Sequence, residues 1–146
     1  MEMLTDSKVL TIVIAIILAL ICLAVILILA GYRRRLLTGF EDMDGEEFER
    51  HCAELLKEAG FGHVEITPPS HDFGADILAD RDGISYAFQC KYYDKPVGVH
   101  AVQEVYAGRD YYGCMVGVVI TNNTFTAPAK ELAESLKILL WDVEKI

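Results

Sequence analysis

One long apolar run divides the chain into two parts. Val9 to Ala30 contains 22 residues without a charge, and nearly all of them are Ile, Leu, Val or Ala. As a helix this run would be about 33 Å long, enough to cross a hydrocarbon core about 30 Å thick. A helix buried in a small soluble domain needs a polar face, and this run has none. The run therefore predicts a transmembrane helix over residues 9–31.

The residues that flank the run predict its orientation. Residues 1–8 hold two acids and one lysine, whereas Arg33, Arg34 and Arg35 follow the run. Arg and Lys are enriched on cytoplasmic flanks, so we expect a short extracytoplasmic N-terminus and a basic juxtamembrane linker at residues 32–43. The rest of the chain would then lie in the cytoplasm, held at the cell membrane by a single pass.

Two other interpretations of this region fit the sequence less well. A cleaved signal peptide carries its basic residues before the apolar segment, which is the opposite of the order here. The three arginines could instead contact nucleic acid, but contact with anionic lipid is the simpler interpretation.

The remaining chain is strongly acidic. Residues 36–146 hold 20 acidic and 9 basic residues, a formal net charge of −11. This charge disfavours a strong general affinity for nucleic acid, because such binding rests on Lys and Arg that neutralise phosphates. The four cysteines show no spacing typical of zinc sites or disulfide frameworks, which favours small buried thiols in the cytoplasm.

Residues 44–146 alternate between helical and extended patterns. Asp44 and Glu47 form a capping-box pattern before a helix that ends at Gly60. Asp80-Arg81-Asp82-Gly83 predicts a hairpin turn. The predicted elements are a helix at 44–59, strands at 63–67, 75–79 and 84–92, a helix at 99–112, a strand at 115–121, a helix at 127–137 and a strand at 138–143. This α-β-β-β-α-β-α-β order predicts a three-layer α/β domain with a mixed sheet, preceded by the transmembrane helix.

Polar residues converge where the predicted hairpin ends. Asp76 lies near the start of one strand, while Gln89 and Lys91 project from one side of the next and Cys90 turns to the other. Carboxylate and amide oxygens suit Mg²⁺, and a nearby lysine can steady the attacking water or the developing negative charge. We therefore expect Asp76 to bind a metal ion, with Gln89 and the Cys90 backbone carbonyl as further ligands.

Neighbouring helices offer further candidates. Glu49 borders the buried stripe of the first helix and could act on the metal through water. Gln103 on the helix at 99–112 is either a solvated side chain or a contact to phosphate or water. His71 and His100 could act as acid–base groups, although structural or solvent-facing histidines are the simpler interpretation. An Asp…Gln-x-Lys pattern is weak by itself, because polar residues on a strand face are commonly just solvated.

A series of short segments follows in order along residues 44–142. They are Asp44-Gly45, Phe48-Glu49, Ser70-His71-Asp72-Phe73-Gly74-Ala75-Asp76, Gln89-Cys90-Lys91, Pro96-Val97-Gly98, Ala101-Val102-Gln103-Glu104-Val105, Val119-Ile120-Thr121-Asn122, Phe125-Thr126 and Leu140-Trp141-Asp142. In these segments the chain resembles the catalytic domain of Mrr-like (type IV) restriction endonucleases, a branch of the PD-(D/E)xK nuclease superfamily. The resemblance implies a restriction-endonuclease-like core and covers nearly the whole acidic part.

The resemblance also implies an activity. It indicates a DNA endonuclease that depends on Mg²⁺, with Mn²⁺ as a substitute, and that serves restriction or defence. The positions of the family's active-site residues are occupied by Glu49, Asp76, Gln89 and Lys91, and glutamine in place of the superfamily's acid is usual in this branch. His71 stands where the family commonly has a glycine.

The expected contacts with DNA are weaker. Asp72 and Gln103 are the candidates for contact with DNA or its phosphates. The family often recognises modified DNA through an additional DNA-binding domain, and here a membrane helix takes that place. Target preference is therefore not inherited from the family.

The main hypothesis is a membrane-anchored cytoplasmic DNA endonuclease. A homodimer would supply the two sites that double-strand cleavage usually needs. The first alternative is a catalytically silent module that keeps the nuclease fold for binding or assembly at the membrane, which the acidic charge favours. The second alternative is a nuclease that acts on RNA.

Overall fold

The computed structural model describes residues 13–28, 43–68 and 73–146. The chain forms two compact units, residues 1–43 and residues 44–146. The elements of the second unit are α2 (Gly45–Glu58), β1 (Gly62–Ile66), β2 (Ile77–Arg81), β3 (Ile84–Lys91), α3 (Val99–Tyr111), β4 (Val116–Thr121), α4 (Ala127–Leu136), β5 (Ile138–Asp142) and the short 3-10 helix η1 (Val143–Lys145). The predicted order of helices and strands is confirmed.

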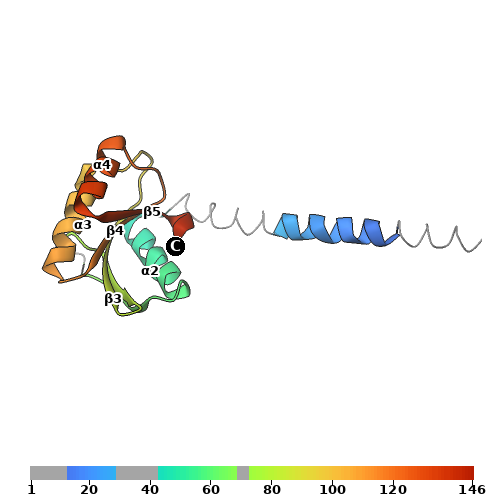
Figure 1. Ribbon diagram of the computed structural model, residues 1–146, viewed down its shortest axis with the longest axis horizontal. Helices are drawn as coiled ribbons and strands as arrows, with labels where there is room; N and C mark the ends of the chain where they lie inside the picture. The colour runs from blue at the N-terminus through green and yellow to red at the C-terminus, as the bar shows by residue number, and fades with distance from the viewer. Residues whose placement is uncertain (1–12, 29–42, 69–72) are drawn as a thin grey trace, which may run out of the picture. The chain divides into compact units, whose positions relative to one another are not determined.

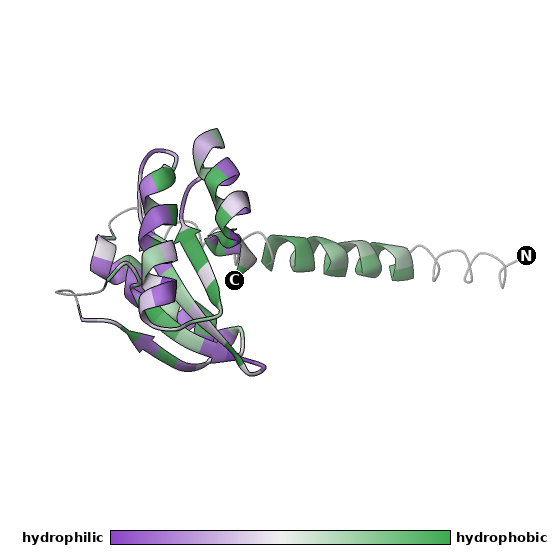
Figure 2. Ribbon diagram, turned by 60° about the vertical axis from the view of Figure 1, so that its left-hand side comes forward, coloured by the Kyte–Doolittle hydropathy of each residue, from purple (hydrophilic) through white to green (hydrophobic). Residues whose placement is uncertain are grey.

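The described part of the first unit is an apolar helix. Residues 13–28 are helical, and Figure 2 shows hydrophobic residues on every side of them. Their large apolar side chains are exposed, from 44% at Val13 to 69% at Ile28. Within the described ranges, no helix combines the length and the apolar character that crossing a membrane requires. Residues 1–12 and 29–42, which include the ends of the predicted span and most of the predicted linker, lie outside the described residues.

The second unit is built on a five-stranded mixed sheet with strand order β1-β2-β3-β4-β5. β1, β2 and β3 pair antiparallel, whereas β3, β4 and β5 pair parallel. Parallel neighbours need a crossover, which α3 and α4 provide. The predicted mixed sheet is confirmed.

The hairpin between β2 and β3 has a shorter turn than predicted. Arg81 pairs with Ile84, so the turn contains only Asp82 and Gly83. Both have positive φ, 54° and 78°, as a type I′ turn requires. Because Asp80 and Arg81 continue the ladder, the strand predicted at 75–79 lies instead at Ile77–Arg81.

The ends of α2 follow the local signals of the sequence. The Glu47 N–H donates to Oδ1 of Asp44 over 2.8 Å, and the Asp44 N–H donates to Oε2 of Glu47 over 3.1 Å. This reciprocal pair confirms the predicted capping box. At the other end Gly60 has φ of 89°, and the Phe61 N–H donates to the Leu56 carbonyl over 3.0 Å. The predicted stop at Gly60 is therefore also confirmed.

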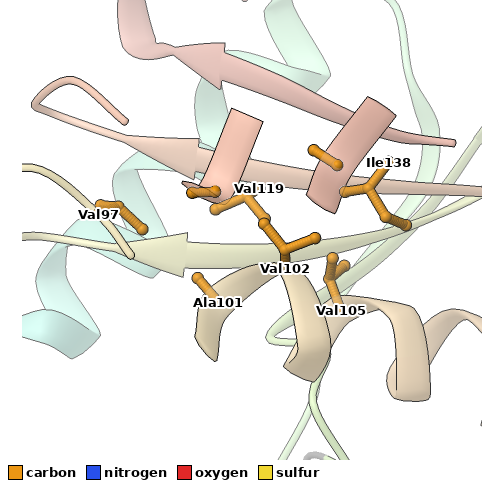
Figure 3. Close-up of a cluster of buried hydrophobic side chains, with 8 residues drawn as sticks. Val97, Ala101, Val102, Val105, Val119 and Ile138 are labelled. Carbon is orange, nitrogen blue, oxygen red and sulfur yellow. The ribbon is translucent and has the colours of Figure 1, made fainter. Parts of the chain in front are cut away.

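Helices cover both faces of the sheet (Figure 1). α3 and α4 bury one face through a cluster of small and branched side chains, part of which Figure 3 labels. Its members are Val97, Ala101, Val102, Val105, Val119, Ala129, Ala133 and Ile138. α2 lies on the other face, where Phe61, Phe88 and Trp141 form an aromatic group with ring centroids 5.7 to 6.4 Å apart. The layers bury the C-terminal half of β3 between helices, whereas its first residue, Ile84, is exposed.

The apolar patterns of residues 84–92 and 99–112 predict buried side chains at Ile84 and Tyr106, but both side chains lie at the surface. Ile84 is 37% exposed, because it begins β3 directly after the hairpin turn. Tyr106 is 36% exposed and carries the Arg109 guanidinium over its ring, 4.7 Å from the centroid. On α3 the buried position that follows Val105 is Gly108, because the helix approaches a loop there too closely for a larger side chain.

The capping box gives a direct test of the start of the second unit. Asp44→Ala removes the acceptor for the Glu47 N–H, and we expect it to lower the free energy of unfolding by about 1 kcal/mol. Asp44→Asn keeps an acceptor oxygen and should stay close to wild type. Trp141 is the only tryptophan of the chain, so its fluorescence during urea denaturation reports this unit alone. A result in which the Ala and Asn variants unfold alike would contradict the capping role.

Candidate active site

β2 and β3 separate where Asp76 enters the sheet. The ladder between them ends at the pair Ile77 and Phe88. Just before it, the Asp76 N–H donates to the Phe88 carbonyl over 2.7 Å, and the Asp76 carbonyl accepts from the Thr67 N–H over 2.9 Å. These two backbone hydrogen bonds fix Asp76 between β3 and the residue that follows β1.

After the ladder ends, the carboxylate of Asp76 accepts the backbone hydrogen bond of β3 that β2 no longer accepts. Beyond Phe88, the next N–H of β3 that points toward β2 belongs to Cys90. It donates to Oδ2 of Asp76 over 2.6 Å, and Nε2 of Gln89 donates to the same oxygen. Asp76 is 5% exposed and Gln89 is 3% exposed. The alternative that these polar residues are simply solvated is therefore wrong, because they form one buried hydrogen-bonded unit.

Lys91 is held by a carboxylate from the neighbouring helix. Its Nζ lies 2.8 Å from Oε2 of Glu104 on α3, and its side chain is 19% exposed. Burial lowers the pKa of Lys91, but the hydrogen bond and charge of Glu104, together with the charge of Asp76, outweigh burial and raise that pKa above its ordinary value. Lys91 therefore carries an ammonium group at neutral pH, which suits it to stabilise negative charge.

Glu49 approaches the same segment of β3 from the opposite face. It is half-buried on α2, the helix toward which the Cys90 side chain projects. A hydrogen bond with Cys52 and burial raise the pKa of the Cys90 thiol well above its ordinary value, and the charges of Asp76 and Glu49 raise it further. The structure thus brings Glu49 close enough to β3 for its charge to act there.

The loop that leads into Asp76 crosses α3 at two glycines. Gly74 has φ of +92°, and a Cβ placed on it would lie 2.1 Å from the backbone oxygen of Glu104. A Cβ on Gly108 would lie 2.7 Å from the carbonyl group of Gly74. A side chain at either position would push the loop away from the helix. α3 therefore contacts the loop two residues before Asp76.

The oxygen donors around Asp76 fit a hard divalent cation such as Mg²⁺. The Cys90 carbonyl leaves β3 at the same edge as the N–H that is bonded to Asp76, so both groups face one side. Gln89 presents its amide nitrogen to Asp76, because an amide that faces a carboxylate must donate. This contact differs from the predicted coordination through the amide oxygen. Among the described residues, no three His, Cys, Asp or Glu side chains gather as metal ligands.

The other residues predicted for the site either lie apart from the Asp76–Gln89 unit or belong to the part of the chain that the structure does not describe. Gln103 is exposed on α3, directly before Glu104. His100 is exposed on the first turn of the same helix. Asp72, predicted to contact DNA, and His71 lie outside the described residues.

Two further residues of the site were not predicted. Thr67 is 6% exposed, and its Oγ1 donates to the Ala75 carbonyl over 2.7 Å. Nothing in the sequence marks it as part of the site. Glu104 follows the buried Ala101 by three positions and precedes the buried Gly108 by four. This spacing could have placed Glu104 at the border of the buried face of α3.

Comparison with protein families finds a match over most of the chain. The model of the restriction endonuclease family Mrr_cat matches residues 40–146. The chain therefore belongs to this restriction endonuclease family. A comparison with curated proteins finds no match.

Two solved structures share the fold of the second unit. AF1548, a protein of unknown function, is similar with a TM-score of 0.55 and 27% sequence identity, over 64% of this chain and 55% of that chain. AspBHI, a DNA modification-dependent restriction endonuclease, is similar with a TM-score of 0.51 and 18% identity, over 66% of this chain and 28% of that chain. The chain thus spans about half the length of AF1548 and less than a third of AspBHI.

The environment of Cys90 predicts slow alkylation, because iodoacetamide reacts with ionised thiols. Its raised pKa keeps the thiol neutral at pH 8, whereas the unfolded chain has the ordinary value. We expect Cys90 to react at least about tenfold more slowly in the native chain than in urea, as measured by mass spectrometry of its peptide. Cys114 is only half-buried and should react faster than Cys90 in the native chain. Equal rates for native and unfolded Cys90 would contradict the described packing.

Proposed function

We propose that this protein is a metal-dependent DNA endonuclease that hydrolyses phosphodiester bonds and serves restriction or defence. The observation that carries the proposal is the buried unit of Asp76 and Gln89 beside the charged Lys91 at one edge of the sheet. Membership of a restriction endonuclease family supports the same reaction class.

The surroundings of each residue support a distinct role. Asp76 and the Cys90 carbonyl would hold Mg²⁺ or Mn²⁺, with Gln89 fixing the orientation of the carboxylate and able to add its own oxygen. When bound, such an ion lowers the pKa of a water molecule and withdraws charge from the phosphate. Lys91 offsets the negative charge that develops on the phosphate. Glu49 adds negative charge near the ion and would act through water.

The acidic charge of the second unit affects how strongly it binds nucleic acid. Residues 36–146 carry a net charge of −11, so general contacts with phosphates are weak and binding depends on local groups. Asp72 and Gln103 are proposed as local contacts to DNA or phosphate. A homodimer would supply two such sites for double-strand cleavage.

A cleavage assay on the purified full-length chain tests the reaction. With Mg²⁺ or Mn²⁺, we expect cleavage of at least one form in a panel of duplex, modified duplex and single-stranded DNA. Asp76→Ala and Lys91→Ala should each lower the rate by about 100-fold or more, because each removes a charge that acts on the phosphate or its metal ion. Chelation of divalent metal ions by EDTA should stop cleavage.

Matched controls separate loss of chemistry from loss of folding. Asp82→Asn changes an acid in the hairpin turn, where asparagine tolerates the positive φ. Lys130→Ala removes an exposed lysine from α4. Both should cleave like wild type. If no DNA form is cut, or if Asp76→Ala cuts as fast as wild type, the catalytically silent module becomes the better hypothesis; cleavage of RNA alone would change the substrate class.

We further propose that one transmembrane helix anchors the chain in the cell membrane, with the nuclease domain in the cytoplasm. The support lies in the sequence, where the uncharged run Val9 to Ala30 is followed by Arg33, Arg34 and Arg35. Anchoring would place the site near DNA that arrives at the membrane.

A charge placed in the middle of the run tests the anchor. Leu20→Arg should move much of the chain out of the carbonate-resistant membrane fraction, because arginine at a helix centre costs about 2.5 to 3.5 kcal/mol on insertion. Leu20→Phe keeps the apolar character and should remain with the membrane. Both fractions are measured by immunoblot. Release of the wild-type chain by carbonate would refute the anchor.

A further inference from the structure

α3 contacts both halves of the proposed active site through one turn of helix. The side chain of Glu104 reaches Lys91, with Nζ 2.8 Å from Oε2. The backbone oxygen of Glu104 lies so close to Gly74 that a Cβ on this glycine would be only 2.1 Å from it. One residue of α3 therefore touches the lysine at the end of β3 and the loop that carries Asp76.

The end of this turn reinforces the second contact. Gly108 lies four residues after Glu104, so the two share one face of the helix. A Cβ on Gly108 would meet the Gly74 carbonyl carbon and oxygen at 2.7 Å and the Ala75 nitrogen at 2.8 Å. The absence of a side chain at Gly108 and Gly74 allows the loop to lie directly on the helix backbone. Asp76 follows Gly74 by two residues, which leaves little freedom between this contact and the carboxylate.

Lys91 needs such a partner for its ammonium group to have a defined place. A lysine has four rotatable side-chain bonds, and β3 fixes only its Cα. Glu104 is 44% exposed but its partner is only 19% exposed, so the pair is partly shielded from water. A shielded pair with a short N–O distance restricts the ammonium group more than a fully exposed pair would.

We propose that the Glu104–Gly108 turn of α3, here named the α3 support, aligns Lys91 with Asp76 for the reaction. Glu104 is a positioning residue that acts through Lys91, and Gly108 acts through the loop before Asp76. The inference rests on the proposed nuclease function and adds two residues to which that function assigns no role. According to this inference, one turn of α3 determines the distance between the Lys91 ammonium group and the Asp76 carboxylate, so this distance does not depend on the flexible side chains alone.

Spectroscopy of the full-length chain in detergent micelles tests the first contact without any cleavage. In ¹H–¹⁵N spectra of lysine ammonium groups, a hydrogen-bonded Lys91 should give a signal with slow proton exchange, assigned by its loss in Lys91→Arg. Glu104→Gln should abolish this signal. Glu131→Gln removes an exposed carboxylate from α4 and should leave the signal unchanged. A Lys91 signal that persists in Glu104→Gln overturns the positioning role.

Kinetics test whether the alignment matters for the reaction. Glu104→Gln should lower kcat by about tenfold or more without raising KM, because it displaces Lys91 and removes no contact with the substrate. Glu104→Asp keeps the charge and should recover part of the loss. Equal kcat values for Glu104→Gln, Glu131→Gln and wild type overturn the inference.

A second variant tests the loop contact. Gly108→Ala should lower kcat by about 100-fold, because its Cβ displaces the loop before Asp76, while the Lys91 signal remains. Gly45→Ala is the matched control, because a Cβ there meets nothing within 4 Å. If Gly108→Ala unfolds, as judged by Trp141 fluorescence, the Glu104 variants decide the question.

The two proposals fail in different ways. A wild-type chain that shows the Lys91 signal and cuts no nucleic acid contradicts the nuclease function. A wild-type chain that cuts DNA at the same rate as Glu104→Gln contradicts the α3 support alone.

Discussion

The site depends on how one backbone N–H of β3 is satisfied after β2 has turned away. A buried N–H without an acceptor is costly, so the Cys90 N–H needs a partner at the point where its antiparallel neighbour ends. Oδ2 of Asp76 supplies it over 2.6 Å, and Gln89 donates to the same oxygen. The carboxylate therefore closes the end of a ladder and is placed at a sheet edge by the same contact. Its position follows from the needs of the backbone.

Successive side chains of β3 point alternately to the face of the site and to the face of the aromatic core. Gln89 and Lys91 face α3, whereas Phe88 and Cys90 face α2, where Phe88 packs on Phe61. Parallel pairing with β4 joins Gln89 to Val119 and Lys91 to Thr121, and the Thr121 hydroxyl also donates to the Lys91 carbonyl. Polar chemistry on one face of this strand thus rests on apolar packing on the other.

The parts of the fold that depend on local chemistry could be predicted from the sequence. The Asp44–Glu47 capping box and the Asp82-Gly83 turn involve neighbours in the chain, and so does the alternation that puts Gln89 and Lys91 on one side. The start of β2 was misplaced because Asp76 is extended but bonds outside the ladder, to Thr67 and Phe88.

The parts that depend on packing between distant elements could not be predicted. The burial of Gln89 results from helices that cover the sheet, which strand alternation does not reveal. The partner of Lys91 is Glu104, thirteen residues later on another element, and only the docking of α3 brings them together. The close approach of Gly74 to α3 is likewise a tertiary contact.

The length of the type I′ turn at Asp82 and Gly83 sets the pairing register at the far end of its hairpin, where the site lies. Five pairs connect β2 with β3 from Arg81 and Ile84 to Ile77 and Phe88, a length of about 14 Å. Because side chains and hydrogen-bonding groups alternate with every residue, one residue more or fewer in the turn would shift all of these pairs. The carboxylate would then meet a segment whose N–H points to β4. A solvent-facing turn without catalytic groups thus sets which backbone atoms meet in the site.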